Sequence, residues 1–273
     1  MCSSDLWSVS EPQSVSLLPG PGDAELLLSS AFAVSLIYVN YAYTGWNAAT
    51  YIINEVDEPQ RNMPVILFAG TAVVMVLYLL LNYTFLHAAP QEQMAGKIEI
   101  GVIVAQSAFG ETGAMVMGIM LATLLVSTVS AMVIAGPRVL QVIGEDFRLF
   151  RVMARKSREQ IPVIAILVQS GLTLFFIMTS TFESVLVFSG FVMGVNTFFA
   201  VAGVFILRRR SDVKAAYRTF GYPVTPLIYL ILMAWTLTFI LINRPQEGWA
   251  GLGIITAGVL LYLVSEKLNQ RSA

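Results

Sequence analysis

The sequence predicts an all-α polytopic membrane protein with about seven transmembrane helices. Hydrophobic residues make up 56% of the chain and charged residues only 12%, whereas ordinary soluble domains carry about 25% charged residues. The charged residues are also segregated, because seven long runs contain none. Each run is near or above the roughly 18 to 20 residues that cross about 30 Å of hydrocarbon, and none alternates as a barrel strand does. The runs cover residues 26–54, 62–91, 112–137, 160–182, 184–207, 219–243 and 248–265.

The basic residues predict the orientation of these helices. If residue 30 lies outside, 14 of the 16 Lys and Arg residues lie on the opposite side, and only Lys97 and Arg244 lie outside. The positive-inside rule then places the C-terminus in the cytoplasm. We therefore expect a multi-pass protein of the plasma or inner cell membrane, in contact with the lipid bilayer. The net charge of −1 gives no indication of a nucleic-acid partner.

Residues 1–25 precede the first apolar run and differ from it in composition. They lack the basic and apolar regions of a signal peptide, and their prolines and glycines disfavour a helix. We expect a disordered tail or a non-native scar here. Cys2 is the only cysteine, so no internal disulfide is expected.

The first predicted span, residues 26–55, contains a weak point. Thr44 and Gly45 stand where an uninterrupted helix would favour leucine or alanine, and a glycine costs a helix about 1 kcal/mol relative to alanine. Backbone groups freed at membrane depth must face protein, a cavity or a polar molecule. At the cytoplasmic exit we expect a turn, where Pro59 stops one helix and Pro64 fits the first turn of the next.

The second predicted span, residues 64–88, ends near the only histidine, His87, which we interpret as an interfacial rim residue and not as a ligand. Residues 89–111 form a longer outer loop, whose isoleucine and valine residues predict a short helix against the membrane face. This helix is either a lid or a plain connector, and the sequence supports both equally.

The third predicted span, residues 112–142, carries hydroxyl residues on one helical face. Thr123, Ser127 and Ser130 follow one another at spacings of four and three. These hydroxyls either bond carbonyls one turn earlier and let helices approach, or they line a path for a cation or substrate. The segment between the third and fourth spans carries six basic residues. These residues either only set the membrane topology or also contact anionic lipid heads.

The four remaining spans complete the predicted bundle. A short turn makes the first two of them an antiparallel hairpin, and Gly190 and Gly194 are spaced for close packing of two helices. The last two spans carry few polar groups, so we expect a scaffold or lipid-facing role. The spans are residues 162–180, 184–207, 223–243 and 248–266.

Three stretches resemble segments of amino acid permeases of the amino acid-polyamine-organocation superfamily, closest to its large-neutral-amino-acid branch. The first is similar to the sixth transmembrane helix and the following turn, the second to the inner end of the eighth helix, and the third to the link between the tenth and eleventh. They read YAYTGWNAATYIINEVDEPQRNMP at 41–64, AGPRVLQVIGED at 135–146 and LRRRSDVKAAYRTFGYPVTP at 207–226.

The resemblance implies a partial LeuT-like fold, because the family has twelve helices and this chain resembles the sixth through twelfth. Residues 26–207 would form the second of two inverted five-helix repeats, and residues 208–273 would form two accessory helices and a C-terminal tail. The binding site of such a fold lies between the repeats. Missing N-terminal helices or a partner subunit would therefore supply its other half.

The resemblance also implies a substrate site at the weak point of the first span. Tyr41 takes the place of an aromatic gate, and the carbonyls of residues 41–44 fall where relatives bind the ammonium group of the substrate. The end of a helix exposes carbonyls and a negative dipole pole, which suits a cation. Gly45 would allow the break, and the neutral amide of Asn47 favours neutral amino acids. The expected substrate-binding residues here are Tyr41, Ala42, Tyr43, Thr44, Gly45, Trp46 and Asn47.

Further site residues are expected elsewhere in the chain. Met193 and Val195 lie near positions of the family's tenth helix that shape the side-chain pocket, and the hydroxyl residues of the third span match the region of the eighth helix that holds sodium in sodium-coupled relatives. Glu55 and Arg61 are expected to pair at an inner gate. The expected ion path consists of Thr123, Ser127, Thr128 and Ser130.

These features together predict a secondary active transporter, a permease or an exchanger, that moves amino acids by alternating access and is present here as a truncated fragment. Neutral amino acids are the expected substrates. Two alternatives stay open: a non-transporting membrane scaffold or regulatory half-transporter, and a seven-helix receptor. An enzyme is not expected, because the sequence shows no catalytic triad, phosphate-binding glycine loop or metal cluster, and we expect no cofactor.

Overall fold

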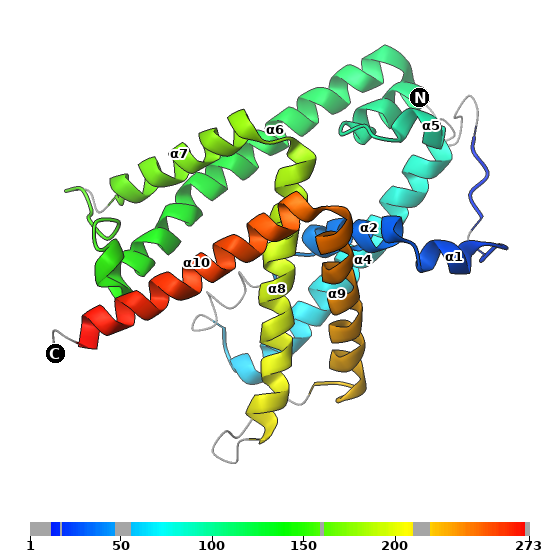
Figure 1. Cartoon of the computed structure of the whole chain (residues 1–273). Helices are drawn as coiled ribbons and strands as arrows, with labels where there is room; N and C mark the ends of the chain where they lie inside the picture. Colours follow the sequence, from blue (N-terminus) through cyan, green and yellow to red (C-terminus); the bar gives the residue numbers. More distant parts are fainter. Residues whose placement is uncertain (1–11, 17, 47–55, 159–160, 210–218, 271–273) are drawn as a thin grey trace. The chain divides into compact units, whose positions relative to one another are not determined.

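The computed structural model describes residues 12–16, 18–46, 56–158, 161–209 and 219–270 (Figure 1). Within them the regular elements are helices. Five of these helices are long and apolar enough to cross a membrane, and two further apolar helices are shorter. The predicted class, an all-α polytopic membrane protein, is confirmed.

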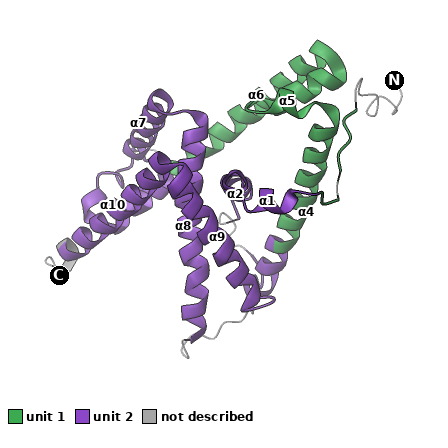
Figure 2. Cartoon of the chain, turned by 45° about the vertical axis from the view of Figure 1, so that its right-hand side comes forward, with its two compact units in different colours: residues 1–20, 68–136 green, residues 21–67, 137–273 purple. Residues whose placement is uncertain are grey.

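The chain forms two compact units (Figure 2). One consists of residues 1–20 and 68–136, and the other of residues 21–67 and 137–273. These units are defined by packing, whereas the predicted boundary at residue 207 separates a five-helix repeat from two accessory helices. That boundary stays a prediction. By packing, the helices on either side of this boundary, 182–209 and 224–243, belong to the same unit.

The first unit contains most of α4 (Pro59–Ala88), the short α5 (Gln91–Met94) and the first part of α6 (Ile100–Asp146). Gly110 interrupts α6 with φ of 69° and ψ of −163°. The preceding turns fold back on the helix, since a Cβ placed on Gly101 would lie 3.7 Å from Leu121 Cδ1. A short helix is therefore present within residues 89–111, and its predicted place against the outer membrane face stays a prediction. A small buried cluster of Ala88, Ala89, Met94 and Val104 closes this end of the unit.

His87 lies at the end of α4 and joins it to the segment before the first apolar run. Its Nδ1 is 3.0 Å from the carbonyl oxygen of Gln13, and the backbone N–H of Gln13 donates to the His87 carbonyl at 2.9 Å. The imidazole also stacks on Tyr83, with ring centroids 5.9 Å apart. These contacts give the histidine a local structural role at the helix end.

The predicted disordered tail, residues 1–25, has local structure in part. Residues 1–11 and 17 lie outside the described residues, but α1 (Asp23–Leu27) is a short helix. It begins after Gly22, which has φ of 101°, and carries Asp23 and Glu25 in its first turn. Acidic side chains at this end of a helix favour the helical state, and the composition argument from prolines and glycines did not take this into account.

The second unit has α8 (Phe182–Arg209) at its centre, in contact with α2 (Ser30–Ala42), α9 (Val224–Asn243) and α10 (Pro245–Gln270). The glycines of α8 permit this, because a Cβ on Gly190 would lie only 2.8 Å from Ile37 Cγ1 of α2. A Cβ on Gly194 would lie 3.2 Å from Met233 Sδ of α9. The packing role predicted for both glycines is confirmed. The buried core consists of Ile37, Val187, Phe191, Val195 and Ile240.

The predicted role of Pro64 at the first turn of the second span is wrong in register. The helix α4 already begins at Pro59, after Glu58, whose φ is 45°. The Glu58 carbonyl accepts the N–H groups of Arg61 and Asn62. Pro59 therefore starts the helix, where a missing N–H costs nothing, and Pro64 lies inside it.

A short apolar helix, α7 (Val163–Thr179), precedes α8 and is joined to it by the predicted short turn, but the two helices do not pack along their length as the predicted antiparallel hairpin would. Its 17 residues span about 25 Å. The turn is tight, since α8 begins at Phe182, and the Thr181 hydroxyl accepts a hydrogen bond from the Ser184 N–H at 3.2 Å. Before α7, a 3-10 turn, η3 (Arg148–Phe150), follows α6.

Candidate functional site

The weak point predicted in the first span is a real helix end. The helix α2 stops at Ala42, residues 43–46 form a turn, and Gly45 has φ of 106°. L-residues rarely adopt this left-handed conformation, so the glycine is needed where it stands. The hydroxyl of Thr44 donates to the Tyr41 carbonyl at 2.6 Å, and its N–H donates to the same oxygen at 3.0 Å.

This hydrogen bonding bears on the predicted ammonium site. A carbonyl oxygen has two lone pairs, and in this structure Thr44 engages the Tyr41 carbonyl twice. An ammonium group at this carbonyl would have to replace the Thr44 hydroxyl. The side chains of Tyr41 and Trp46 are partly exposed, at 38% and 48%. Asn47 lies outside the described residues.

Met193 and Val195, the predicted pocket residues of α8, have different surroundings. Val195 is 9% exposed and belongs to the buried core with Ile37 and Ile240. Met193 is 39% exposed. Two residues along a helix turn through about 200°, which explains why they occupy different faces. The structure thus brings Val195 to α2, but as part of the packed core.

The hydroxyl residues of the third span lie on α6, in the other compact unit. Three of them bond carbonyls one turn earlier, which is one of the two arrangements the sequence allowed. The Thr123 hydroxyl donates to Ile119 at 2.8 Å, and that of Ser130 donates to Val126 at 2.8 Å. Thr128 makes the same kind of bond to Leu124 at 2.9 Å. Each oxygen keeps lone pairs, so the ion path stays a prediction.

Only Arg61 of the two predicted inner-gate residues lies within the described residues. Glu55 lies outside the described residues. Arg61 lies 3.6 Å from the Glu58 carboxylate, and the two side chains are 83% and 71% exposed. Such exposed pairs contribute about 0 to 1 kcal/mol. Arg61 is therefore weakly held by its present partner.

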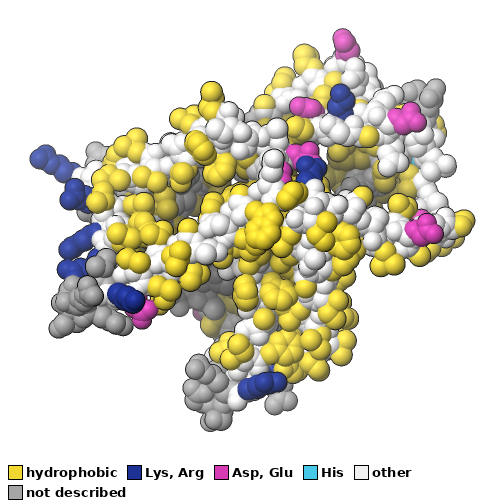
Figure 3. Space-filling model, in the orientation of Figure 1, with side chains coloured by type: hydrophobic (Ala, Val, Ile, Leu, Met, Phe, Trp, Pro, Cys, Tyr) yellow, Lys and Arg dark blue, Asp and Glu magenta, His cyan; other side chains and the backbone are white. Residues whose placement is uncertain are grey.

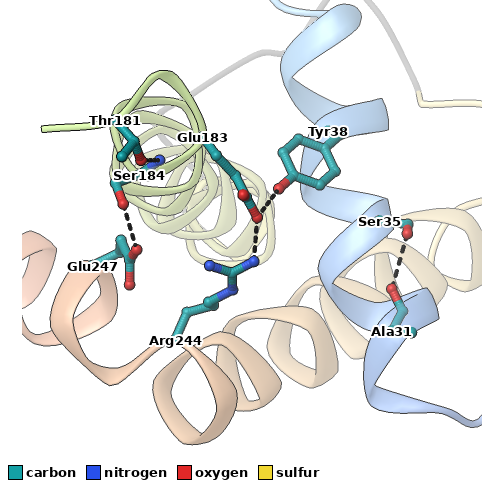
Figure 4. A network of polar contacts seen from close by, with 8 residues as sticks. All are labelled: Ala31, Ser35, Tyr38, Thr181, Glu183, Ser184, Arg244 and Glu247. Atoms are coloured by element: carbon teal, nitrogen blue, oxygen red, sulfur yellow. Dashed lines mark hydrogen bonds and ion pairs between the residues drawn. The ribbon is translucent and has the colours of Figure 1, made fainter. Parts of the chain in front are cut away.

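A polar network that joins α2, α8 and the start of α10 was not predicted (Figure 4). The Tyr38 hydroxyl of α2 donates to Glu183 Oε1 of α8 at 3.2 Å, and the Arg244 guanidinium pairs with the same oxygen. Beside it, the Ser184 hydroxyl donates to Glu247 Oε1 at 2.9 Å. The network ties the half-helix α2 to α8 and to the turn between α9 and α10. Arg244 was the sequence signal, as one of two basic residues expected outside.

Known proteins now place this chain in a family. The family profile described as "Amino acid permease" matches residues 13–264. The chain belongs to the amino acid permease family, as the three sequence stretches predicted. In the part of the chain that the structure describes, no group of three or more His, Cys, Asp or Glu side chains is placed to hold a metal ion.

The names of three similar proteins are those of amino acid transporters. The chain is 24% identical over 234 residues to "Large neutral amino acids transporter small subunit 2" of Mus musculus, which covers 85% of this chain and 44% of that protein. It is 21% identical to "Asc-type amino acid transporter 1" of Mus musculus, with 85% and 44% covered. It is 22% identical to "Cystine/glutamate transporter" of Homo sapiens, with 84% and 46% covered. The chain thus spans less than half the length of these relatives.

Proposed function

We propose that this chain is one half of a secondary active transporter that moves amino acids across a membrane by alternating access. The observation that carries this proposal is the end of α2 at Ala42, followed by Gly45 with φ of 106°, within a long apolar segment. A helix broken at membrane depth offers backbone carbonyls and the negative end of a helix dipole. Both bind an ammonium group without requiring a buried carboxylate.

The proposed substrates are neutral amino acids, taken by uniport or exchange. The names of the large-neutral and Asc-type relatives support this class. Asn47 supports it from the sequence, because an amide at the broken helix does not pair with a cationic substrate. The Tyr41 ring would close over the substrate, and Met193 and Val195 would shape the pocket for its side chain.

The proposed transporter needs further helices. The chain spans 44% to 46% of the three relatives compared above, and a LeuT-like site takes a broken helix from each of two repeats. Helices preceding the matched region, or a partner subunit, would supply the other broken helix. The excess of Lys and Arg on one side supports an orientation with the C-terminus in the cytoplasm of a plasma or inner cell membrane.

Two further roles belong to this proposal. The back-bonded hydroxyls of Thr123, Thr128 and Ser130 would use their remaining lone pairs for a coupling cation, together with Ser127. When the inner gate closes, Arg61 would leave its present partner Glu58 and pair with Glu55. Little free energy is lost when Arg61 leaves Glu58, because an exposed ion pair of this kind is weak.

Uptake of radiolabelled leucine into vesicles tests the function. We expect no flux from the chain alone and flux when five N-terminal helices of the same family are co-expressed with it. Within that complex, Gly45→Ala should lower uptake on the order of tenfold, since left-handed strain costs about 1 to 3 kcal/mol and 1.4 kcal/mol is a factor of ten.

The matched control is Gly70→Ala, a helical glycine of α4 with nothing within 4 Å of its added Cβ. Uptake should survive this change. If leucine flux is missing with and without the added helices, the transporter proposal is wrong, and a non-transporting scaffold becomes the better account. Equal loss from Gly45→Ala and Gly70→Ala would remove the helix break from the mechanism.

A further inference from the structure

The segment that follows α6 is a folded structure and not a loose basic connector. A chain of backbone hydrogen bonds three residues apart runs through it, including Phe150 N–H to Phe147 at 2.9 Å and Met153 N–H to Phe150 at 2.8 Å. The same spacing recurs from Arg155 N–H to Val152 at 3.3 Å. Residues 147–155, called the inner basic turn below, therefore hold their side chains in a defined arrangement.

Two contacts hold the inner basic turn against its neighbours within the same compact unit. At Gly144 of α6 an added Cβ would lie 2.6 Å from the Ala154 nitrogen and 2.7 Å from the Phe150 oxygen, so the turn lies directly on the glycine backbone. The Phe147 ring meets Tyr262 of α10 edge-on, with centroids 5.9 Å apart. The turn is thus held between the end of α6 and α10.

Three arginines of this turn have no counter-charge within the described part of the chain. Arg148, Arg151 and Arg155 are all exposed and all belong to the inner basic turn. By contrast, Lys156 pairs with Glu145 at 3.4 Å. Figure 3 shows basic side chains gathered at the end of the molecule where α10 ends.

Arg151 and Arg155 border a hollow and stand beside exposed apolar residues. An open cavity of about 480 Å³ is lined by Arg151, Val152, Ala154 and Arg155. Leu149 and Val152 are 44% and 51% exposed. A free phosphate ion would use only the guanidinium groups, whereas a lipid also offers acyl chains to the apolar residues. Charge and apolar surface side by side are the chemistry of a membrane interface.

We infer that the inner basic turn binds the phosphate of an anionic phospholipid headgroup. Arg151 and Arg155 hold the phosphate oxygens from the two sides of the hollow, since guanidinium groups bind phosphate through paired N–H donors. Leu149 and Val152 contact the first methylenes of the acyl chains. The inference rests on the membrane-spanning fold, and with the proposed orientation the lipid belongs to the cytoplasmic leaflet.

Binding of a fluorescent dioctanoyl phosphatidylglycerol to the full chain in neutral detergent, followed by anisotropy, tests the inference. We expect saturable binding that inorganic phosphate at the same concentration and dioctanoyl phosphatidylcholine do not displace. R151Q/R155Q should weaken binding on the order of tenfold or more, because each cation near a lipid surface contributes about a factor of five. The double variant R61Q/K267Q removes two other exposed cations expected on the same side and should change affinity by about twofold or less.

A second variant separates the folded site from charge alone. Gly144→Ala keeps every charge but pushes the turn off α6, and it should weaken binding several-fold, whereas Gly171→Ala, with nothing within 4 Å of its Cβ, should not. No binding to the unaltered chain overturns the inference. So does equal weakening by R151Q/R155Q and R61Q/K267Q, unchanged affinity in Gly144→Ala, or full displacement by inorganic phosphate, which would indicate a site for free anions.

Discussion

Replacing Gly190 by alanine should loosen the packing of α2 on α8. The added Cβ would lie 2.8 Å from Ile37 Cγ1, which is 0.6 Å inside the 3.4 Å at which ordinary contacts begin. Ile37 is fully buried and branched at Cβ, so it has little freedom to rotate away. Overpacking of this kind costs about 1 to 3 kcal/mol, while alanine regains about 1 kcal/mol of helix propensity.

The same substitution at Gly203 provides the reference, because that glycine lies in the same helix and nothing is within 4 Å of its added Cβ. Gly203→Ala should stabilise the protein by up to about 1 kcal/mol. Gly190→Ala should then unfold more easily than Gly203→Ala by about 1 to 3 kcal/mol. Thermal unfolding in detergent, followed by circular dichroism, measures this difference. Equal stability of the two variants would refute the close contact between α2 and α8.

Two further predictions concern the break in α6 and the Tyr38–Glu183–Arg244 network. Gly110→Ala should destabilise the protein by about 1 to 3 kcal/mol, because Gly110 has φ of 69° and ψ of −163°; Gly118→Ala in the same helix should not, and equal melting temperatures would contradict the break. Tyr38→Phe removes the hydrogen bond to Glu183 and should cost about 0.5 to 1.5 kcal/mol. A double-mutant cycle with Glu183→Gln should then show non-additive melting temperatures, whereas strict additivity would mean that Tyr38 and Glu183 do not interact.

Local features of the sequence were sufficient for most of the helices and for the end of α2. Charge-free runs of about twenty residues indicated the spans, because burial of a polar backbone in lipid leaves few alternatives to a helix. Gly45 indicated the end of α2, because few residues other than glycine accept its backbone conformation. Helix starts were less well predicted, as Pro59 shows, since a proline ends one helix and begins the next with equal ease.

Long-range contacts could not be predicted in the same way. Tyr38 and Glu183 are 145 positions apart and meet only because α2 packs on α8. The surroundings of Met193 and Val195 depend on which face of α8 meets α2, and the resemblance to other permeases did not specify that face. The hydroxyl bonds of Thr123 and Ser130 are local by contrast, and the sequence offered them as one of two arrangements.

The sequence by itself determined that this protein is a helical membrane protein of the amino acid permease family, with a break in its first span. Hydropathy and glycine conformation are properties of a few neighbouring residues, so they can be read along the chain. Only the tertiary structure decided that Ile37 packs on Gly190 and that Glu183 joins Tyr38 to Arg244. Such arrangements depend on how helices far apart in sequence pack, and the packing surfaces carry no local signature of their partners.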